Sequence, residues 1–218
     1  MKNEEDFYPY IEAKITDEQY KQVVEFAKKS YRGRKGEYLT RKGLQPNLPD
    51  NNPHCIKLFR DIVHGTGAEF IPGIIFSEIK NKNFRLINAP DLNTYDASQK
   101  SYASDLKILH KNNERPFHIK NRPPNTNGLT WLCTKRHVRP NGKINYGDKL
   151  VDPSLTQNNK DLIGFFKQMD GKTYRFYGMI NREILIQYKK EPYNQNQKAT
   201  KVAFYFKDFA DQVFLPKK

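Results

Sequence analysis

The stretch between residues 69 and 80 holds the side chains best suited to chemistry. Glu78 and Lys80 stand two residues apart at the end of an apolar, β-branched run, and Glu69 precedes that run. Side chains two residues apart on a strand share a face. If Pro72-Gly73 forms a two-residue turn, the stretch is a hairpin that places Glu69 diagonally across from Glu78. The spacing therefore predicts one face with two carboxylates and a lysine.

Two carboxylates beside a lysine are suited to metal-assisted hydrolysis of a phosphodiester. Divalent cations bind carboxylate and carbonyl oxygens, and a lysine beside them can orient or activate the attacking water. We expect Glu69, Glu78 and the backbone carbonyl of Ile79 to bind Mg²⁺. Lys80 would then act on the water, and Asp61, on an expected helix upstream, is a further candidate ligand or base.

The charge of the chain points to a polyanionic partner. The 218 residues include 38 Lys and Arg against 24 Asp and Glu, a formal net charge of +14. Double-stranded DNA is the partner we expect, with a membrane surface as the rival. No apolar run is long enough to span a membrane, the N-terminus does not resemble a signal peptide, and no convincing basic amphipathic helix stands out, so no membrane association is expected.

Cysteine usage predicts a cytoplasmic protein without a zinc site. Cys55 and Cys133 are far apart and belong to no Cys-x-x-Cys spacing. The five histidines show no metal-binding spacing either. Both cysteines are therefore expected to be reduced thiols.

Two basic clusters are candidate contacts to nucleic acid. The first lies in a Gly-containing segment that is expected to be a loop, and the second precedes the Asn141-Gly142 turn. A basic loop or hairpin tip can bind phosphates or enter a groove. The candidate residues are Arg32, Arg34 and Lys35 in the first cluster, and Lys135, Arg136, His137 and Arg139 in the second.

The hydrophobic pattern predicts helices first and strands later. Helical spacing begins at Thr16 and Asp17, with Asp17 as N-cap, and ends near Lys29; a second helix covers residues 55–63 and a third residues 98–110. Asn-Gly and Asp-Gly dipeptides at 127, 141 and 170 predict hairpin turns. The expected strands are residues 129–138, 143–150, 162–169, 173–180, 184–188 and 202–206. We therefore expect a single α+β domain over residues 1–218, with N-terminal helices, a central mixed sheet and a β-rich antiparallel C-terminal half.

The segment from Glu69-Phe70 through Gly73-Ile74 to Glu78-Ile79-Lys80 resembles the active-site strand pair of the PD-(D/E)XK nuclease superfamily, and of its MutH-like members in particular. The C-terminal Ala203–Lys207 is similar to a late strand of those enzymes. The resemblance implies a Mg²⁺-dependent DNA endonuclease of the type II restriction kind. Such enzymes often act as dimers on palindromic sites, and the resemblance leaves open whether this chain is a homodimer.

Two alternatives belong to other classes of protein. The first is a non-catalytic basic DNA-binding protein, in which the Glu-x-Lys sequence is incidental. The second is an ADP-ribosyltransferase, because His64-Gly65-Thr66 resembles the His-Gly-Thr signature of that family. Tyr102 and Glu183 would then take the roles of the later tyrosine and the catalytic glutamate.

Overall fold

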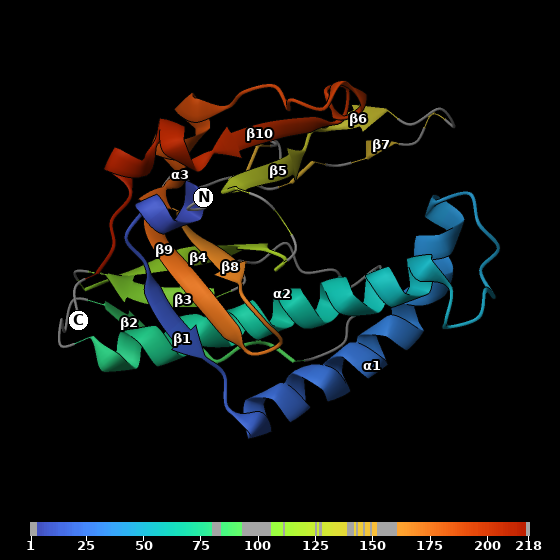
Figure 1. Cartoon of the computed structure of the whole chain (residues 1–218), viewed down its shortest axis with the longest axis horizontal. Coiled ribbons are helices and arrows are strands. Elements are labelled where there is room, and N and C mark those ends of the chain that lie inside the picture. The colour runs from blue at the N-terminus through green and yellow to red at the C-terminus, as the bar shows by residue number, and fades with distance from the viewer. Residues whose placement is uncertain are drawn as a thin grey trace.

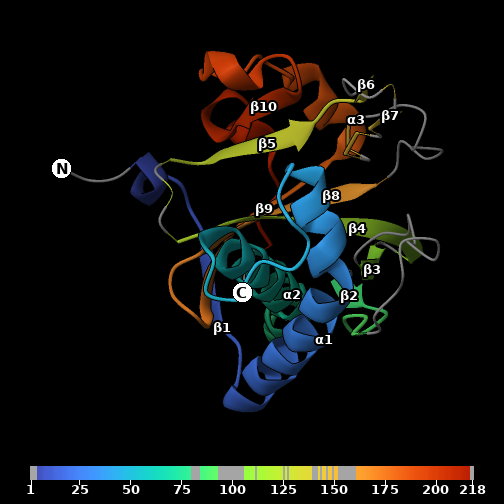
Figure 2. The ribbon, with the colours of Figure 1, turned by 90° about the vertical axis from the view of Figure 1, so that its right-hand side faces the viewer.

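Two long helices lie against one face of a six-stranded mixed sheet, and a small two-stranded sheet lies on its other face (Figures 1 and 2). The structure, a computed structural model, describes residues 4–79, 84–92, 106–110, 112–124, 126, 128–138, 142, 144–145, 147–148, 150–151 and 161–216. The expected α+β class with a mixed sheet is confirmed.

The helices and strands follow in this order along the chain. They are η1 (Glu4–Phe7), β1 (Ile11–Lys14), α1 (Asp17–Arg41), α2 (Pro53–Glu78), β2 (Phe84–Leu86), β3 (Leu106–His110), β4 (Asn113–Arg122), β5 (Thr130–Thr134), β6 (His137–Val138), β7 (Ile144–Asn145), β8 (Leu162–Gln168), β9 (Thr173–Asn181), α3 (Arg182–Leu185), η3 (Ile186–Tyr188), η4 (Gln195–Gln197), β10 (Lys201–Tyr205), η5 (Phe206–Asp208) and η6 (Ala210–Gln212).

Helix α1 starts where the sequence predicts a helix but is longer than expected. Its N-cap is Thr16 rather than Asp17, because the Thr16 hydroxyl accepts from the Gln19 N–H while the Gln19 side chain accepts from the Thr16 N–H. This reciprocal pair is a capping box. The helix continues through the basic segment 31–36, which is therefore not a loop, and ends at Arg41. Tyr31 and Leu39 are buried in this second half, and tertiary packing outweighs the helix-weakening effect of Gly33 and Gly36.

The predicted hairpin at residues 69–80 is wrong, because residues 53–78 form one continuous helix, α2. Pro72 lies inside this helix and forms no turn with Gly73. The buried residues recur at the helical period: Ala68, Ile71, Pro72, Ile75 and Phe76. A helix was expected over residues 55–63 only, and neither Gly65 nor Gly67 ends it. Burial of this apolar face against α1 and the sheet holds the segment helical despite its β-branched residues.

The large sheet has the strand order β1-β9-β8-β4-β3-β2, and β4–β8 is its one parallel pair. The expected hairpin of β8 and β9 is confirmed. Its turn is held by Asp170, whose Oδ1 accepts from the N–H groups of Lys172 and Thr173. Strand β10 pairs with β5, and β6 pairs with β7, each antiparallel, as the β-rich second half predicts.

Two of the predicted elements have the wrong type. Residues 106–110, the described end of a predicted helix, form strand β3. Residues 184–188, a predicted strand, belong to α3 and η3. Both segments are short and apolar, and such runs do not distinguish helix from strand by periodicity. Of the predicted strand 143–150, the described residues are in strand only at Ile144–Asn145.

The two faces of the large sheet have separate hydrophobic cores. Phe117, Phe166 and Phe176 pack toward α1 and α2, whereas Phe165 and Tyr177 pack toward β5 and β10. Neighbouring residues of β8 and of β9 therefore contribute to opposite cores. Of the helices in the described residues, none is long and apolar enough to cross a membrane.

Candidate functional site

A cavity of about 450 Å³ lies between α2, β4 and β5 and contains two of the predicted acidic residues. Asp61 and Glu69 of α2 both line it. The other lining residues are His64, Gly65, Ile119, Lys120, Asn121, Arg122, Pro123, Trp131, Leu132 and Asp148. The volume falls within the range of small-ligand sites. The structure thus brings the two acids together with basic residues that come more than fifty positions later.

The cavity is positioned by the end of β4 that extends past β3. Pairing of β4 with β3 stops at Phe117 in the described residues, whereas its pairing with β8 continues to Arg122. Side chains alternate along this end. Asn121 points toward α2, where its Nδ2 donates to the His64 carbonyl at 3.0 Å. Lys120 and Arg122 belong to the opposite face, toward β5.

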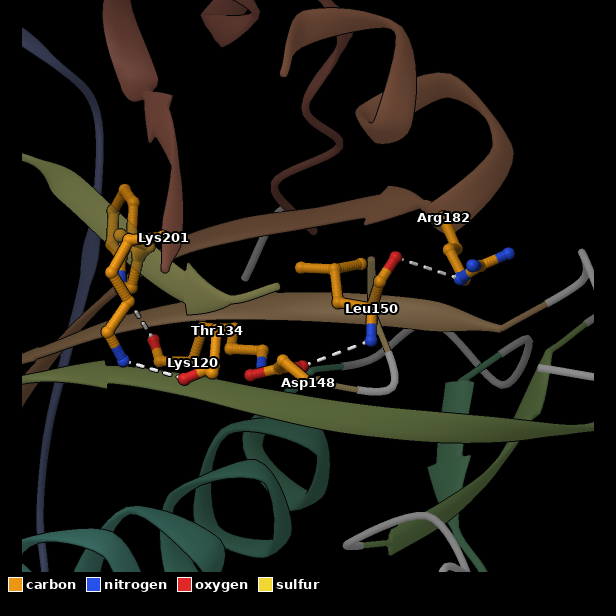
Figure 3. A network of polar contacts seen from close by, with 7 residues as sticks. Lys120, Thr134, Asp148, Leu150, Arg182 and Lys201 are labelled. Atoms are coloured by element: carbon orange, nitrogen blue, oxygen red, sulfur yellow. Dashed lines mark hydrogen bonds and ion pairs between the residues drawn. The ribbon is translucent and has the colours of Figure 1, made fainter. Parts of the chain in front are cut away.

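Lys120 forms an ion pair with Asp148 at the cavity wall (Figure 3). Its Nζ lies 2.6 and 2.8 Å from the two carboxylate oxygens of Asp148, and the two side chains are only 19% and 26% exposed. Burial would raise the pKa of Asp148, but the Lys120 ammonium and the Leu150 N–H together hold this pKa below its ordinary value. Asp148 is therefore ionised at neutral pH, and its charge fixes the position of Lys120.

The ion pair is connected to β5 on two sides. The Trp131 indole N–H donates to the Lys120 carbonyl at 2.9 Å, and the Asp148 N–H donates to the Thr134 carbonyl at 2.8 Å. Trp131 is almost completely buried. Hydrogen bonds to β5 thus hold both Lys120 and Asp148 in the cavity wall.

A second polar pair lies two residues earlier on β4. The Nε2 atom of His118 lies 2.9 Å from Oδ2 of Asp161, and both side chains are nearly buried. The other oxygen of Asp161 has no hydrogen-bond partner among the described residues. His118 is on the same face as Lys120, but it does not line the cavity.

His64 contributes a neutral imidazole to the cavity. Burial lowers its pKa, although the nearby Asp61 acts in the opposite direction. Its Nδ1 atom is buried and has no hydrogen-bond partner in the described part of the chain. The imidazole of His64 therefore lines the cavity without carrying charge at neutral pH.

The predicted metal site is not assembled as the hairpin implied. Asp61 and Glu69 are eight residues apart on α2, about 12 Å along the helix axis. Two oxygen ligands of one ion each lie roughly 2–2.6 Å from it, so both side chains would have to extend toward each other along α2 to share an ion. Glu78 is nine residues beyond Glu69, at the end of α2 with Ile79 after it, and neither residue lines the cavity. Lys80 lies outside the described residues.

The predicted basic clusters are placed on different elements. Arg32, Arg34 and Lys35 lie in the second half of α1, and the Lys35 Nζ binds the Asp50 carboxylate at 2.5 Å. Lys135 and Arg136 join β5 to β6 and therefore precede the β6–β7 pair rather than forming its turn. His137 starts β6, and Arg139 lies outside the described residues.

The residues of the alternative ADP-ribosyltransferase site are not brought together in the described structure. His64 lies within α2, whereas Glu183 lies in α3 and does not line the cavity. Tyr102 lies outside the described residues.

The described residues contain no group of three or more His, Cys, Asp and Glu side chains arranged to hold a metal ion. Mg²⁺ commonly takes only one or two protein carboxylates and completes its shell with phosphate and water, so one cavity carboxylate of α2 is enough for a candidate ligand.

Lys120 and Asp148 were not among the sequence-predicted residues. One signal for Lys120 is present in the sequence: His118, Lys120 and Arg122 alternate with other residues over a run that forms a strand. No comparable signal marks Asp148, because its pairing depends on the fold. Comparison with known proteins adds no further guide: no protein-family model, curated protein or solved structure matches this chain.

Proposed function

We propose that the protein is a metal-dependent nuclease of double-stranded DNA and that the cavity between α2 and β4 is its active site. The observation that supports this most is that two α2 carboxylates and the basic residues Lys120 and Arg122 line one cavity. A phosphodiester with its metal ion carries charges of both signs, and such a wall offers a partner to each. The net charge of +14 favours the same polyanionic substrate.

In this proposal Lys120 takes the role that the sequence suggested for Lys80. Asp148 holds its ammonium at the cavity wall, where it can contact a phosphate oxygen or orient the attacking water. Glu69, the acid that the sequence pattern favours, is the proposed carboxylate ligand of Mg²⁺, and Asp61, which also lines the cavity, is the alternative ligand. When bound, Mg²⁺ would supply Lewis-acid stabilisation of charge on the phosphate.

Restriction-type sequence specificity and a homodimer enter the proposal through the family resemblance alone. A non-catalytic DNA-binding protein is the second candidate, and one observation favours it: the two cavity acids lie about 12 Å apart along the axis of α2 instead of side by side. One result distinguishes the two candidates, because only the nuclease cleaves DNA.

The test is incubation of supercoiled plasmid with and without Mg²⁺, using a variant that fills the cavity. A Cβ at Gly65 would meet nothing within 4 Å, and Gly65 lines the cavity, so Gly65→Leu is the variant chosen to fill it. Gly33 is also helical with open space around its Cβ, but it does not line the cavity, so Gly33→Leu is the matched control.

The nuclease proposal expects the parent and Gly33→Leu to convert plasmid to nicked or linear DNA only with Mg²⁺, and Gly65→Leu to leave it supercoiled. Intact plasmid with the parent under all conditions, together with a retarded gel band, would instead identify a DNA-binding protein. Equal cleavage by both glycine variants would move the active site away from this cavity.

A further inference from the structure

Three lysines gather at the end of the β5–β10 pair, next to the candidate active site. Lys201 of β10 is opposite Thr134 of β5, and its Nζ donates to the Thr134 hydroxyl at 2.6 Å. The Lys135 Nζ donates to the carbonyl of Lys198 at 2.9 Å. We call Lys135, Lys198 and Lys201 the ribbon lysines.

This cluster is physically continuous with the cavity. Trp131 and Leu132 of β5 line the cavity, and Thr134 follows them on the same strand. The Thr134 carbonyl accepts from the N–H of Asp148, the residue that binds Lys120. Figure 3 shows Lys201 and Thr134 beside Lys120 and Asp148.

The cation at the cavity wall, Lys120, and the ribbon lysine Lys201 are close enough to the same buried side chain for both charges to act on it. That side chain is the buried thiol of Cys133. Burial dominates and raises the pKa of Cys133, so the thiol stays neutral and adds no negative charge.

The ribbon lysines remain accessible to a ligand. All three are partly exposed, and Arg136, which follows Lys135, is exposed. In the described structure Lys198 binds Glu191 at 3.0 Å, whereas the recorded partner of the Lys201 ammonium is a neutral hydroxyl. A phosphate is a stronger partner for an ammonium than a hydroxyl is.

We propose that the ribbon lysines bind a second phosphate of the same DNA strand whose scissile phosphate lies in the cavity. This inference rests on the proposed function and specifies its substrate. The protein would require a strand that reaches from Lys120 to Lys201, and a small phosphodiester with one phosphate group would use the cavity only. The sequence pointed to Lys135, but Lys198 follows η4 and Lys201 begins β10, both more than sixty residues later.

The test measures DNA binding in the absence of Mg²⁺, so that cleavage plays no part. Affinity for a fluorescein-labelled DNA duplex is measured over a series of salt concentrations for the parent, Lys201→Gln, Lys201→Arg and the control Lys28→Gln. Lys28 is an exposed lysine of α1 that pairs with Glu25. Affinity falls as salt rises, so the slope of log affinity against log salt is negative. Loss of one phosphate contact should reduce the magnitude of this slope by about 0.9.

The expected result is a reduced slope and a several-fold weaker affinity for Lys201→Gln, with parental values for Lys201→Arg and Lys28→Gln. A parental slope for Lys201→Gln would overturn the inference. The inference would also be overturned if Lys201→Gln lost binding to vesicles of phosphatidylserine and phosphatidylcholine while its affinity for DNA stayed parental. The lysines would then bind a membrane surface.

A separate activity assay distinguishes this inference from the proposed function. With Mg²⁺, hydrolysis of bis(p-nitrophenyl) phosphate should be equal for the parent and Lys201→Gln, because that substrate has one phosphate. If the parent hydrolyses neither this ester nor DNA, the proposed nuclease fails. A reduced salt slope for Lys201→Gln would still support the ribbon lysines as a phosphate contact.

Discussion

Both carboxylate oxygens of Asp148 lie within hydrogen-bond distance of the Lys120 ammonium, although 28 residues separate the two along the chain. The pair is mostly buried, so each charge depends on the other. Its contribution can be measured without any knowledge of the substrate.

Asp148→Asn should destabilise the protein by about 3 kcal/mol, because it leaves the Lys120 ammonium without its counter-charge. Lys120→Met combined with Asp148→Asn should recover part of this loss, since no buried charge remains. Urea unfolding of the parent, the two single variants and the double variant measures the coupling. Additive effects of the two substitutions would show that the ion pair contributes nothing of its own.

His64→Gln should make stability less sensitive to mild acid. The pKa of His64 is lowered in the fold, so the unfolded chain binds this proton more readily than the native protein does. The parent is therefore fully stable above the ordinary histidine pKa of about 6.5 and loses stability as pH falls below it. Urea midpoints at about pH 7.5 and 5.5 should differ more for the parent than for the variant. A larger pH effect in the variant would contradict the lowered pKa.

Gly67→Ala should destabilise the protein, on the order of 1–3 kcal/mol, because α2 packs closely on the sheet there. The new Cβ would lie 2.1 Å from the hydroxyl oxygen of the buried Tyr174, so either the ring or the helix must move. Gly33→Ala, in open space on α1, should instead stabilise by about 0.5–1 kcal/mol. Thermal unfolding of the two variants should therefore shift in opposite directions, and shifts of the same sign would contradict this packing.

Glu69→Gln should reduce Mg²⁺-dependent plasmid cleavage on the order of 10²-fold or more, if the proposed function holds, because Glu69 is the proposed ligand within the cavity. Glu78→Gln should cleave like the parent, since Glu78 lies about 13 Å further along α2. Asp61→Asn should reduce plasmid cleavage less than Glu69→Gln does. Loss of cleavage in Glu78→Gln with normal cleavage in Glu69→Gln would reverse the assignment.

The sequence by itself determined the features that depend on neighbours along the chain. The start of α1 follows from Thr16 and the residues just after it, and the β8–β9 hairpin follows from two apolar runs around Asp170-Gly171. The choice of Asp61 and Glu69 as chemically interesting acids also came from the sequence, and the structure places both in one cavity.

Tertiary structure decided the conformation of residues 69–78 and the partners of the acids. The β-branched run there is compatible with strand and helix alike, and burial of Ile71 and Ile75 against the sheet and α1 selects the helix. Lys120 became part of the site because the parallel pairing of β4 with β8 carries it past the end of β3 to face β5. Asp148 belongs to a loop, and its backbone N–H donates to the Thr134 carbonyl, which holds it next to Lys120. Such contacts depend on the path of the whole chain, which local propensity and spacing do not specify.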